Sequence, residues 1–165
     1  MQNLTISQIE EKAQELLAKH FGRQFEPPIK VEDLLHRLRG SIEVRYTEEA
    51  DPESLRIKDD GSFTVFLPIN TSYRRDRFTI AHELGHLVLH YPHAEETKAY
   101  RRYGQSRQET EANAFAGALL MPEKAFRDFW YEHRHLTHDA RLDAVVRQFQ
   151  VSKSAADVRR QVLNV

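Results

Sequence analysis

Hydrophobic positions along the chain repeat with two different periods, one typical of strands and one typical of helices. The strand-like pattern alternates hydrophobic and polar residues in three short pieces, and Asp60-Gly61 marks a hairpin turn before the third piece. These pieces are Ile42–Tyr46, Leu55–Ile57 and Phe63–Leu67. Elsewhere hydrophobic residues recur every three to four positions, which predicts amphipathic helices. The expected helices span residues 7–20, 31–38, 74–90, 108–120, 122–132, 139–148 and 153–162.

The order of these elements predicts the fold class. Strands come early and helices late, so we expect an α+β fold in which a three-stranded sheet packs on helices and the C-terminus is helical. The length suits one domain spanning residues 1–165. Ser7 and Glu10 have the spacing of a capping box at the start of the first helix. The polar, Tyr- and Arg-rich stretch 93–107 is expected to form a surface loop.

Composition and charge narrow the classes of function. The chain has no cysteine, which excludes disulfides, thiol catalysis and thiolate metal sites. A net charge of −1 gives no global attraction to nucleic acid or to a membrane. The N-terminal segment is polar, and no apolar stretch approaches the length that spans a bilayer. We therefore expect a cytoplasmic protein with no membrane partner, in which any metal is held by His, Asp or Glu.

Residues 82–86 read HELGH, which is an HExxH motif. Residues four apart lie on the same face of a helix, so the imidazoles of His82 and His86 can bind one metal ion. Glu83 lies beside the first histidine, where it can take a proton from a water that attacks a carbonyl carbon and pass it to the leaving amine. The motif therefore predicts a hydrolytic site with one Zn²⁺ per chain and Glu83 as its catalytic base.

The motif leaves the third metal ligand open, because a catalytic zinc site normally has three protein ligands. The longer motif HExxHxxGxxH is absent, since Leu89 and Pro92 occupy the positions of its glycine and its third histidine. The next expected helix offers two carboxylates instead, those of Glu109 and Glu111. We expect one of them to complete the site.

Three segments of the chain resemble the ImmA/IrrE-type metallopeptidases. Residues 77–81, RFTIA, precede the HExxH motif, residues 111–122, EANAFAGALLMP, follow it, and residues 149–159 begin with FQVS. The resemblance extends over about residues 27–162, and residues 47–60 match poorly. It implies a gluzincin-like zinc endopeptidase inside bacterial cells that cleaves a helix-turn-helix transcriptional repressor, relieving repression of stress-response or mobile-element genes.

Of the two carboxylates, we predict Glu109 as the third ligand. It shares a side of its helix with Ala112 and Ala116, whose small side chains permit close approach to the HExxH helix. Asn113 lies one turn further on and could accept the free ring N–H of a ligand histidine. The pattern Glu-x-x-x-Asn also resembles the Glu-x-x-x-Asp of thermolysin-like enzymes, whose glutamate binds zinc. Glu111 is then left to flank the site or to pair with an arginine.

An electrophile opposite Glu83 is expected to polarise the substrate carbonyl. The sequence offers Tyr73, Tyr103 and His93 as candidates for this transition-state stabiliser. His90 and His93 follow the motif at spacings that do not suit a ligand, and we interpret both as surface or rim residues.

The strand at residues 62–67 directly precedes the HExxH helix. Its alternation of hydrophobic residues, ended by Pro68, predicts a strand at the edge of the sheet. We expect an extended substrate peptide to add to this edge as a further strand.

A regulatory module is the alternative function. Residues 139–162 resemble a helix-turn-helix, in which Ser152 could cap a recognition helix carrying Lys153, Arg159 and Arg160. This reading gives a DNA-binding or repressor-binding protein with little turnover. The slightly acidic chain favours instead a helical hairpin packed on the core, so no direct nucleic-acid binding is expected. The hairpin is expected to bury Val145, Val146, Phe149, Val151, Val158 and Val162.

Overall fold

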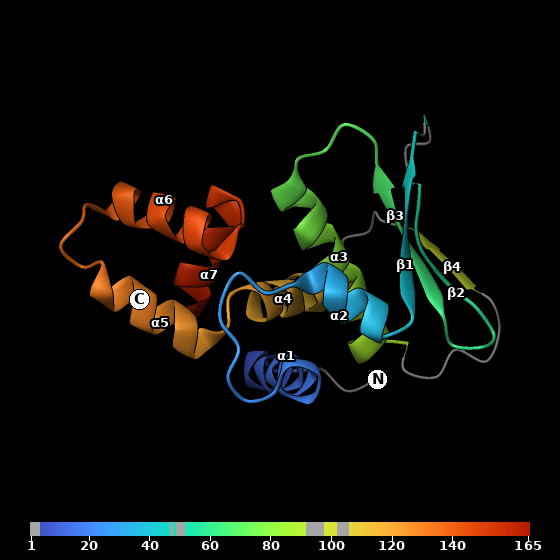
Figure 1. Cartoon of the computed structure of the whole chain (residues 1–165), viewed down its shortest axis with the longest axis horizontal. Coiled ribbons are helices and arrows are strands. Elements are labelled where there is room, and N and C mark those ends of the chain that lie inside the picture. The colour runs from blue at the N-terminus through green and yellow to red at the C-terminus, as the bar shows by residue number, and fades with distance from the viewer. Residues whose placement is uncertain (1–3, 47, 49–51, 92–97, 102–105) are drawn as a thin grey trace. The chain divides into compact units, whose positions relative to one another are not determined.

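The structure is a computed structural model that describes residues 4–46, 48, 52–91, 98–101 (backbone only) and 106–165 (Figure 1). The chain divides into two compact units, which we name by their content. The sheet unit is Lys30–Asn113, and the helical unit combines the chain up to Ile29 with Ala114–Val165. The single domain expected over the whole chain stays a prediction. Among the described residues, no helix has the length and apolar character needed to cross a membrane.

The sheet unit contains a four-stranded sheet with the order β1-β3-β2-β4. β1 (Gly40–Arg45) pairs in parallel with β3 (Phe63–Pro68), and β2 (Glu53–Ile57) pairs antiparallel with both β3 and β4 (Lys98–Arg101). The predicted α+β class is confirmed: the three expected strands are present, and β4 joins them.

Two predictions about the sheet are wrong. β3 is paired on both sides, by β1 and by β2, so residues 62–67 do not form an edge to which a peptide could add. An alternating hydrophobic pattern indicates that one face of a strand is buried. Central strands and edge strands both have such a face, so the pattern does not show how a strand is paired. The expected loop 93–107 contains β4, whose pairing with β2 is made by backbone groups and needs no hydrophobic pattern.

Two helices of the sheet unit, α2 (Val31–Arg37) and α3 (Tyr73–Leu89), lie on one side of the sheet (Figure 1). α2 contacts both α3 and β1, and α3 contacts β3. α3 begins at Ser72, whose side chain accepts a hydrogen bond from the backbone N–H of Arg75. The core between the helices and the sheet is built from the buried residues Val31, Leu34, Leu35, Leu55, Ile57, Phe63, Val65, Leu67, Ile80, Ala81 and Leu84.

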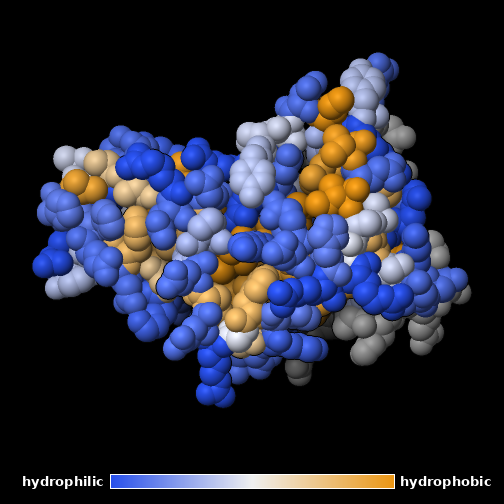
Figure 2. Space-filling view, viewed as in Figure 1, coloured by the Kyte–Doolittle hydropathy of each residue, from blue (hydrophilic) through white to orange (hydrophobic). Residues whose placement is uncertain are grey.

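Part of the helix-facing side of the sheet remains uncovered within this unit. Hydrophobic surface gathers beside the carboxyl ends of β1 and β3 (Figure 2), where Val44 and Ile69 are 61% and 49% exposed. The paired residue of Val44 on β3 is Leu67, which is only 6% exposed. The apolar side of the sheet therefore changes from buried to exposed at this end.

The helical unit contains α1 (Ile6–Phe21), the end of α4 (Arg107–Leu120), α5 (Glu123–Glu132), α6 (His138–Phe149) and α7 (Lys153–Leu163). The bounds of all seven helices fall within one residue of those expected from the sequence. Phe126 and Phe149 are fully buried, with ring centroids 5.8 Å apart, and form part of this unit's core. The helices of this unit are also held by a buried ion pair between Arg159 and Glu10.

The predicted capping box of the first helix is wrong by two positions. Thr5 is the N-cap of α1: its side chain accepts from the backbone N–H of Gln8, and the Gln8 side chain accepts from the backbone N–H of Thr5 at 2.8 Å. Glu10 instead directs its carboxylate to Arg159, whose Nη2 lies 2.9 Å from Glu10 Oε2. A tertiary ion pair has overridden the local capping pattern at Ser7 and Glu10.

Candidate metal centre

α3 brings the two histidines of the HExxH motif together. Both residues are buried, with side chains that are 11% exposed for His82 and 8% exposed for His86. Their ring centroids are 4.8 Å apart, and their Nε2 atoms are 3.1 Å apart. This contact follows directly from the spacing of four residues along a helix.

Glu109, on the first turn of α4, places its carboxylate next to the Nε2 atoms of both histidines. Its Oε2 lies 3.1 Å from His82 Nε2, and its Oε1 lies 3.0 Å from His86 Nε2. Ligand atoms of a tetrahedral zinc site with bonds of about 2.0–2.1 Å are about 3.3 Å apart. These three residues are thus close enough to bind one metal ion, and they are the group of that kind found in the described part of the chain.

The charge balance of this cluster also suits a cation. Burial, together with the neighbouring His82 and His90, lowers the pKa of His86 to about 3, so its ring is uncharged at neutral pH. Burial also raises the pKa of Glu109, because its carboxylate loses contact with water. An uncharged imidazole and a desolvated carboxylate present lone pairs to a common point, and a bound divalent cation would relieve the cost of bringing them together.

The Nδ1 atom of each histidine has a hydrogen-bonding partner other than Glu109. His82 Nδ1 donates to Asn113 Oδ1 at 2.9 Å. His86 Nδ1 lies 3.0 Å from His90 Nδ1. Both rings therefore turn their Nε2 atoms toward Glu109. Asn113 occupies the position that the sequence analysis assigned to a partner of a ligand histidine, and its functional role stays a prediction.

Beside this cluster, Glu83 is almost fully buried, at 1% exposure. Among the candidates for the electrophile, Tyr103 and His93 lie outside the described residues. Tyr73 is 59% exposed, and the Arg77 guanidinium lies 5.7 Å from the centre of its ring. Among the described residues Tyr73 lies against Arg77, and the assignment of an electrophile stays a prediction.

The interpretation of His90 as a surface or rim residue is wrong. Its side chain is 3% exposed, and its Nε2 lies 3.0 Å from Glu111 Oε2. Glu111 also accepts from Arg107 Nε at 2.7 Å through its other oxygen. The sequence contains the signal for this placement, because His90 is four residues after His86 and lies on the same helix face.

Tyr91 is a second residue that sequence reasoning missed. Its ring stacks on the ring of His86, with centroids 5.8 Å apart and planes inclined by 16°. Its hydroxyl lies 3.5 Å from Gln108 Oε1, next to Glu109 in α4. The ring of His86 is thus held by Tyr91 in addition to its hydrogen-bonding partners.

The basic residues of the proposed recognition helix are engaged within the chain. Arg159 is 3% exposed and also donates to the backbone oxygen of Met121 at 2.9 Å, so its guanidinium is not available to a nucleic acid. All three residues form ion pairs: Lys153 with Asp139 and Asp143, Arg159 with Glu10, and Arg160 with Asp157.

One expectation for the C-terminal hairpin is partly wrong. Val158 and Val162 are 59% and 45% exposed, so α7 does not bury them. The buried positions of α7 are Ala156, Arg159 and Leu163, which recur every three to four residues on one face. Val158 is two positions from Ala156 and therefore points away from that face.

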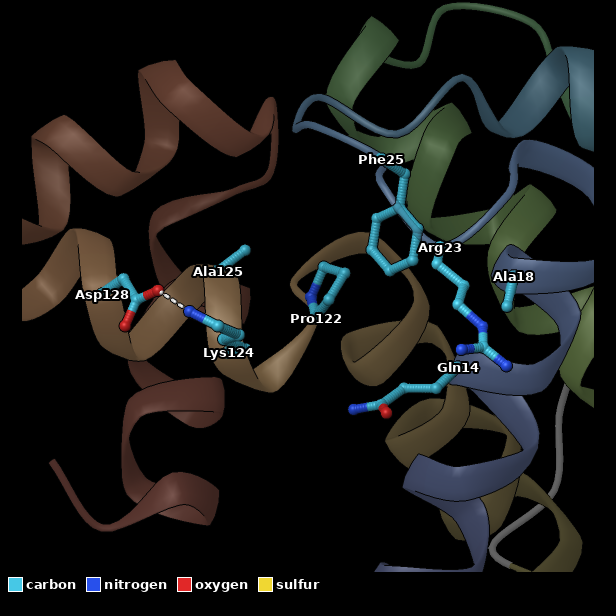
Figure 3. Close-up of a pocket in the computed structure, with 8 residues that line it drawn as sticks. All are labelled: Gln14, Ala18, Arg23, Phe25, Pro122, Lys124, Ala125 and Asp128. Atoms are coloured by element: carbon cyan, nitrogen blue, oxygen red, sulfur yellow. Dashed lines mark hydrogen bonds and ion pairs between the residues drawn. The ribbon is translucent and has the colours of Figure 1, made fainter.

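The helical unit has a pocket of its own, between α1 and α5 (Figure 3). Phe25 and Pro122 supply part of its wall, and Lys124 pairs with Asp128 at 2.5 Å on one side of it. None of the predicted site residues lines this pocket, so it has no part in the metal centre. The full lining is Gln14, Ala18, Arg23, Phe25, Pro122, Lys124, Ala125 and Asp128.

An HExxH helix joined by a glutamate of a second helix, in a small α+β fold, defines the class of this protein as a metallopeptidase. The chain belongs to peptidase family M78, the IrrE N-terminal-like domain, which its sequence matches over residues 41–160. The match includes the whole metal centre and confirms the resemblance to the ImmA/IrrE-type metallopeptidases. No sequence among curated proteins matches the chain.

Proposed function

We propose that this protein is a zinc-dependent endopeptidase that hydrolyses a peptide bond within a protein substrate. The observation that carries the proposal is the convergence of His82, His86 and Glu109 on one point, at nitrogen–oxygen distances of 3.0 and 3.1 Å. Two histidines and a glutamate are a ligand set that catalytic zinc sites use. The position of Glu83 directly after His82 in α3 adds a base next to these ligands.

The donor set favours zinc over harder cations. Imidazole nitrogens suit Zn²⁺, whereas Ca²⁺ and Mg²⁺ prefer a shell of oxygen ligands. His82, His86 and Glu109 would hold one Zn²⁺ per chain and leave a further coordination position open. When bound, Zn²⁺ supplies a Lewis acid that polarises a carbonyl oxygen and lets water act as a nucleophile near neutral pH.

Glu83 would carry the proton transfers. Its carboxylate takes a proton from the attacking water as the new carbon–oxygen bond forms. It then gives this proton to the amide nitrogen as the carbon–nitrogen bond breaks, which releases an amine and a carboxylic acid. Burial of Glu83 keeps bulk water away from its carboxylate and so strengthens its electrostatic interactions within the site.

The substrate that we propose is a helix-turn-helix transcriptional repressor in the cytoplasm, whose cleavage would relieve repression of stress-response genes. Support comes from membership of the IrrE N-terminal-like family. The ion pairs of Lys153, Arg159 and Arg160 within the chain favour action on a regulator over direct binding to DNA.

Incubation with a repressor encoded beside its gene tests the proposal. The purified protein with one equivalent of Zn²⁺ is expected to cut the repressor at a defined bond, identified by mass spectrometry of the fragments. Glu83→Gln should keep the bound zinc, measured by elemental analysis, and lose nearly all cleavage, because it retains the ligands and removes the base. Retained cleavage by Glu83→Gln would overturn the mechanism. Stable binding of the repressor without cleavage by the wild type would favour the regulatory alternative.

A further inference from the structure

We propose that His90, Glu111 and Arg107 form a hydrogen-bonded relay that fixes the tautomer and the orientation of His86. The relay keeps a proton on His86 Nδ1 and leaves the lone pair of Nε2 directed at the metal position. His90 is then a positioning residue, since it acts through His86 and does not contact the reacting atoms. This inference rests on the proposed metal centre and concerns how the chain prepares that centre for its ion.

The donor and acceptor of each hydrogen bond in the relay follow from Arg107, which lies at its outer end. Arg107 can only donate, and its Nε lies 2.7 Å from Glu111 Oε1, so Glu111 is held as a carboxylate acceptor. The other oxygen, Oε2, lies 3.0 Å from His90 Nε2, which must therefore carry the proton. A neutral imidazole with its proton on Nε2 has a lone pair on Nδ1.

With His90 uncharged, the inner end of the relay follows. His90 Nδ1 accepts, and it lies 3.0 Å from His86 Nδ1, so His86 Nδ1 is the donor. A neutral His86 with its proton on Nδ1 has its lone pair on Nε2. That Nε2 is the atom 3.0 Å from Glu109 Oε1, in the cluster that could hold the metal. Each hydrogen bond in the relay thus has one donor and one acceptor, with no conflict of protons.

Burial makes the relay difficult to replace by water. The side chains of His86, His90 and Glu111 are 8%, 3% and 11% exposed, whereas Arg107, at the outer end, is 49% exposed. An unpaired N–H on His86 would be buried beside the metal ligands, and leaving a buried donor without an acceptor costs about 1–3 kcal/mol. The interior partners are therefore expected to matter more than Arg107.

His90 is not itself a ligand in this arrangement. Both of its ring nitrogens are used, Nδ1 by His86 and Nε2 by Glu111. The two ligand histidines are thus oriented by different means: His82 by the side-chain oxygen of Asn113, and His86 by a second histidine backed by a carboxylate. The negative charge of Glu111 makes His90 a stronger acceptor, which in turn raises the basicity of His86 toward the metal.

The zinc affinity of variants tests how much the relay contributes to metal binding. Competition with a chromophoric chelator is expected to show a fall of about 10–100-fold for His90→Leu, the range typical when a partner of a metal-bound histidine is lost. His90→Gln supplies an amide oxygen as acceptor and should recover most of the affinity. Glu111→Gln keeps an oxygen but loses the charge, so its fall should be smaller than that of His90→Leu, and Arg107→Gln should show the smallest fall.

A matched control is His133→Leu in the helical unit. His133, like His90, follows the end of a helix, and its Nδ1 lies 2.8 Å from the Phe129 carbonyl oxygen. This variant is expected to leave zinc affinity unchanged. Unchanged affinity in His90→Leu, or an equal fall in His90→Leu and His90→Gln, would overturn the relay.

The tautomer of His86 gives a readout that needs no protease activity. Ring ¹H–¹⁵N correlation spectra of the folded protein, with and without Zn²⁺, should show the proton of His86 on Nδ1 in the wild type and in His90→Gln. In metal-free His90→Leu, a mixture of tautomers is expected. A wild-type His86 protonated on Nε2 without metal would refute the relay, even if the protein proved to be a zinc peptidase. Conversely, the expected spectra without any peptide cleavage would leave the relay intact and refute only the proposed activity.

Discussion

Glu109 Oε1 lies 3.0 Å from His86 Nε2, although the two residues belong to different helices. Glu111 shares the helix of Glu109, and its carboxylate meets His90 and Arg107 instead. Two positions along a helix separate side chains by about 200°, so the two carboxylates cannot serve the same point. The packing of α4 against α3 thus gives the two glutamates different partners.

Replacement of Glu109 by alanine should therefore lower zinc affinity far more than replacement of Glu111 by glutamine. The expected loss exceeds the 10–100-fold range, roughly, that is typical of a residue that only orients a ligand. Chelator competition measures both variants, and far-UV circular dichroism checks that α4 is intact. Full zinc affinity in Glu109→Ala would show that the third ligand is another residue.

The metal-free protein should lose stability as the pH falls below neutrality. The pKa of His86 is about 3 in the folded protein and 6.5 in its unperturbed form. Between these values the unfolded chain takes up a proton that the folded protein does not, so this histidine makes the free energy of unfolding fall as the pH decreases from about 6.5 toward 3. Urea denaturation with a chelator, at intervals between pH 5 and 7.5, measures this slope.

The variant His86→Leu isolates this contribution, because leucine is apolar and does not titrate. Its stability should change less with pH than that of the wild type over the same interval. An identical slope in both proteins would mean that the pKa of His86 is not lowered in the folded metal-free protein. Glu109 acts in the opposite sense, since its raised pKa favours the folded state at low pH, and this is why the comparison uses a change at His86 alone.

The buried ion pair of the helical unit should make a large contribution to stability. The side chains of Arg159 and Glu10 are 3% and 12% exposed, and Arg159 also donates to the Met121 backbone oxygen. Removing one partner leaves the other as a buried, uncompensated charge, so Arg159→Met is expected to cost about 3–5 kcal/mol in urea denaturation. The variant Glu10→Gln tests the same pair from the other side.

An exposed ion pair provides the control for this prediction. Lys124 Nζ lies 2.5 Å from Asp128 Oδ2, but the two side chains are 88% and 58% exposed. Lys124→Met should change stability by less than about 0.5 kcal/mol. If Arg159→Met were equally mild, the Arg159–Glu10 contact would contribute little in solution.

Local sequence patterns predicted the helices well and the sheet less completely. Helix bounds follow from periodicity within one segment, so they agree with the structure to within one residue. Strand order depends on partners far away in sequence, and nothing in the alternation of residues 63–67 distinguishes a central strand from an edge strand. β4 was missed for a related reason, because a short polar segment can pair through its backbone alone.

In the candidate site, too, contacts within one helix could be predicted from the sequence more readily than contacts between helices. His82, His86 and His90 follow one another at intervals of four residues, so their proximity is a local consequence of helix spacing. The spacing of His90 fits no ligand motif, but helix geometry places it beside His86. The contact of Glu109 with His82 and His86 depends on how the start of α4 packs, and the sequence indicated it only through the small residues of α4 and the Glu-x-x-x-Asn pattern. Glu10 shows the limit of local reasoning, since its partner Arg159 is near the opposite end of the chain.

Gly40 should be among the least replaceable residues of the sheet unit. It opens β1, and a Cβ added there would lie 2.5 Å from two atoms of the Phe63 ring and 2.7 Å from Leu35 Cγ. Both neighbours are buried, so Gly40→Ala must shift α2 or β3, and we expect a loss of about 1–3 kcal/mol. Gly117→Ala in α4 is the matched control, because its nearest neighbour, Arg159 Cδ, is 3.9 Å away and alanine favours a helix by about 0.5–1 kcal/mol. The midpoints of thermal and urea unfolding should therefore fall for Gly40→Ala and rise for Gly117→Ala. Unchanged midpoints in Gly40→Ala would mean that β1 and α2 pack less closely in solution.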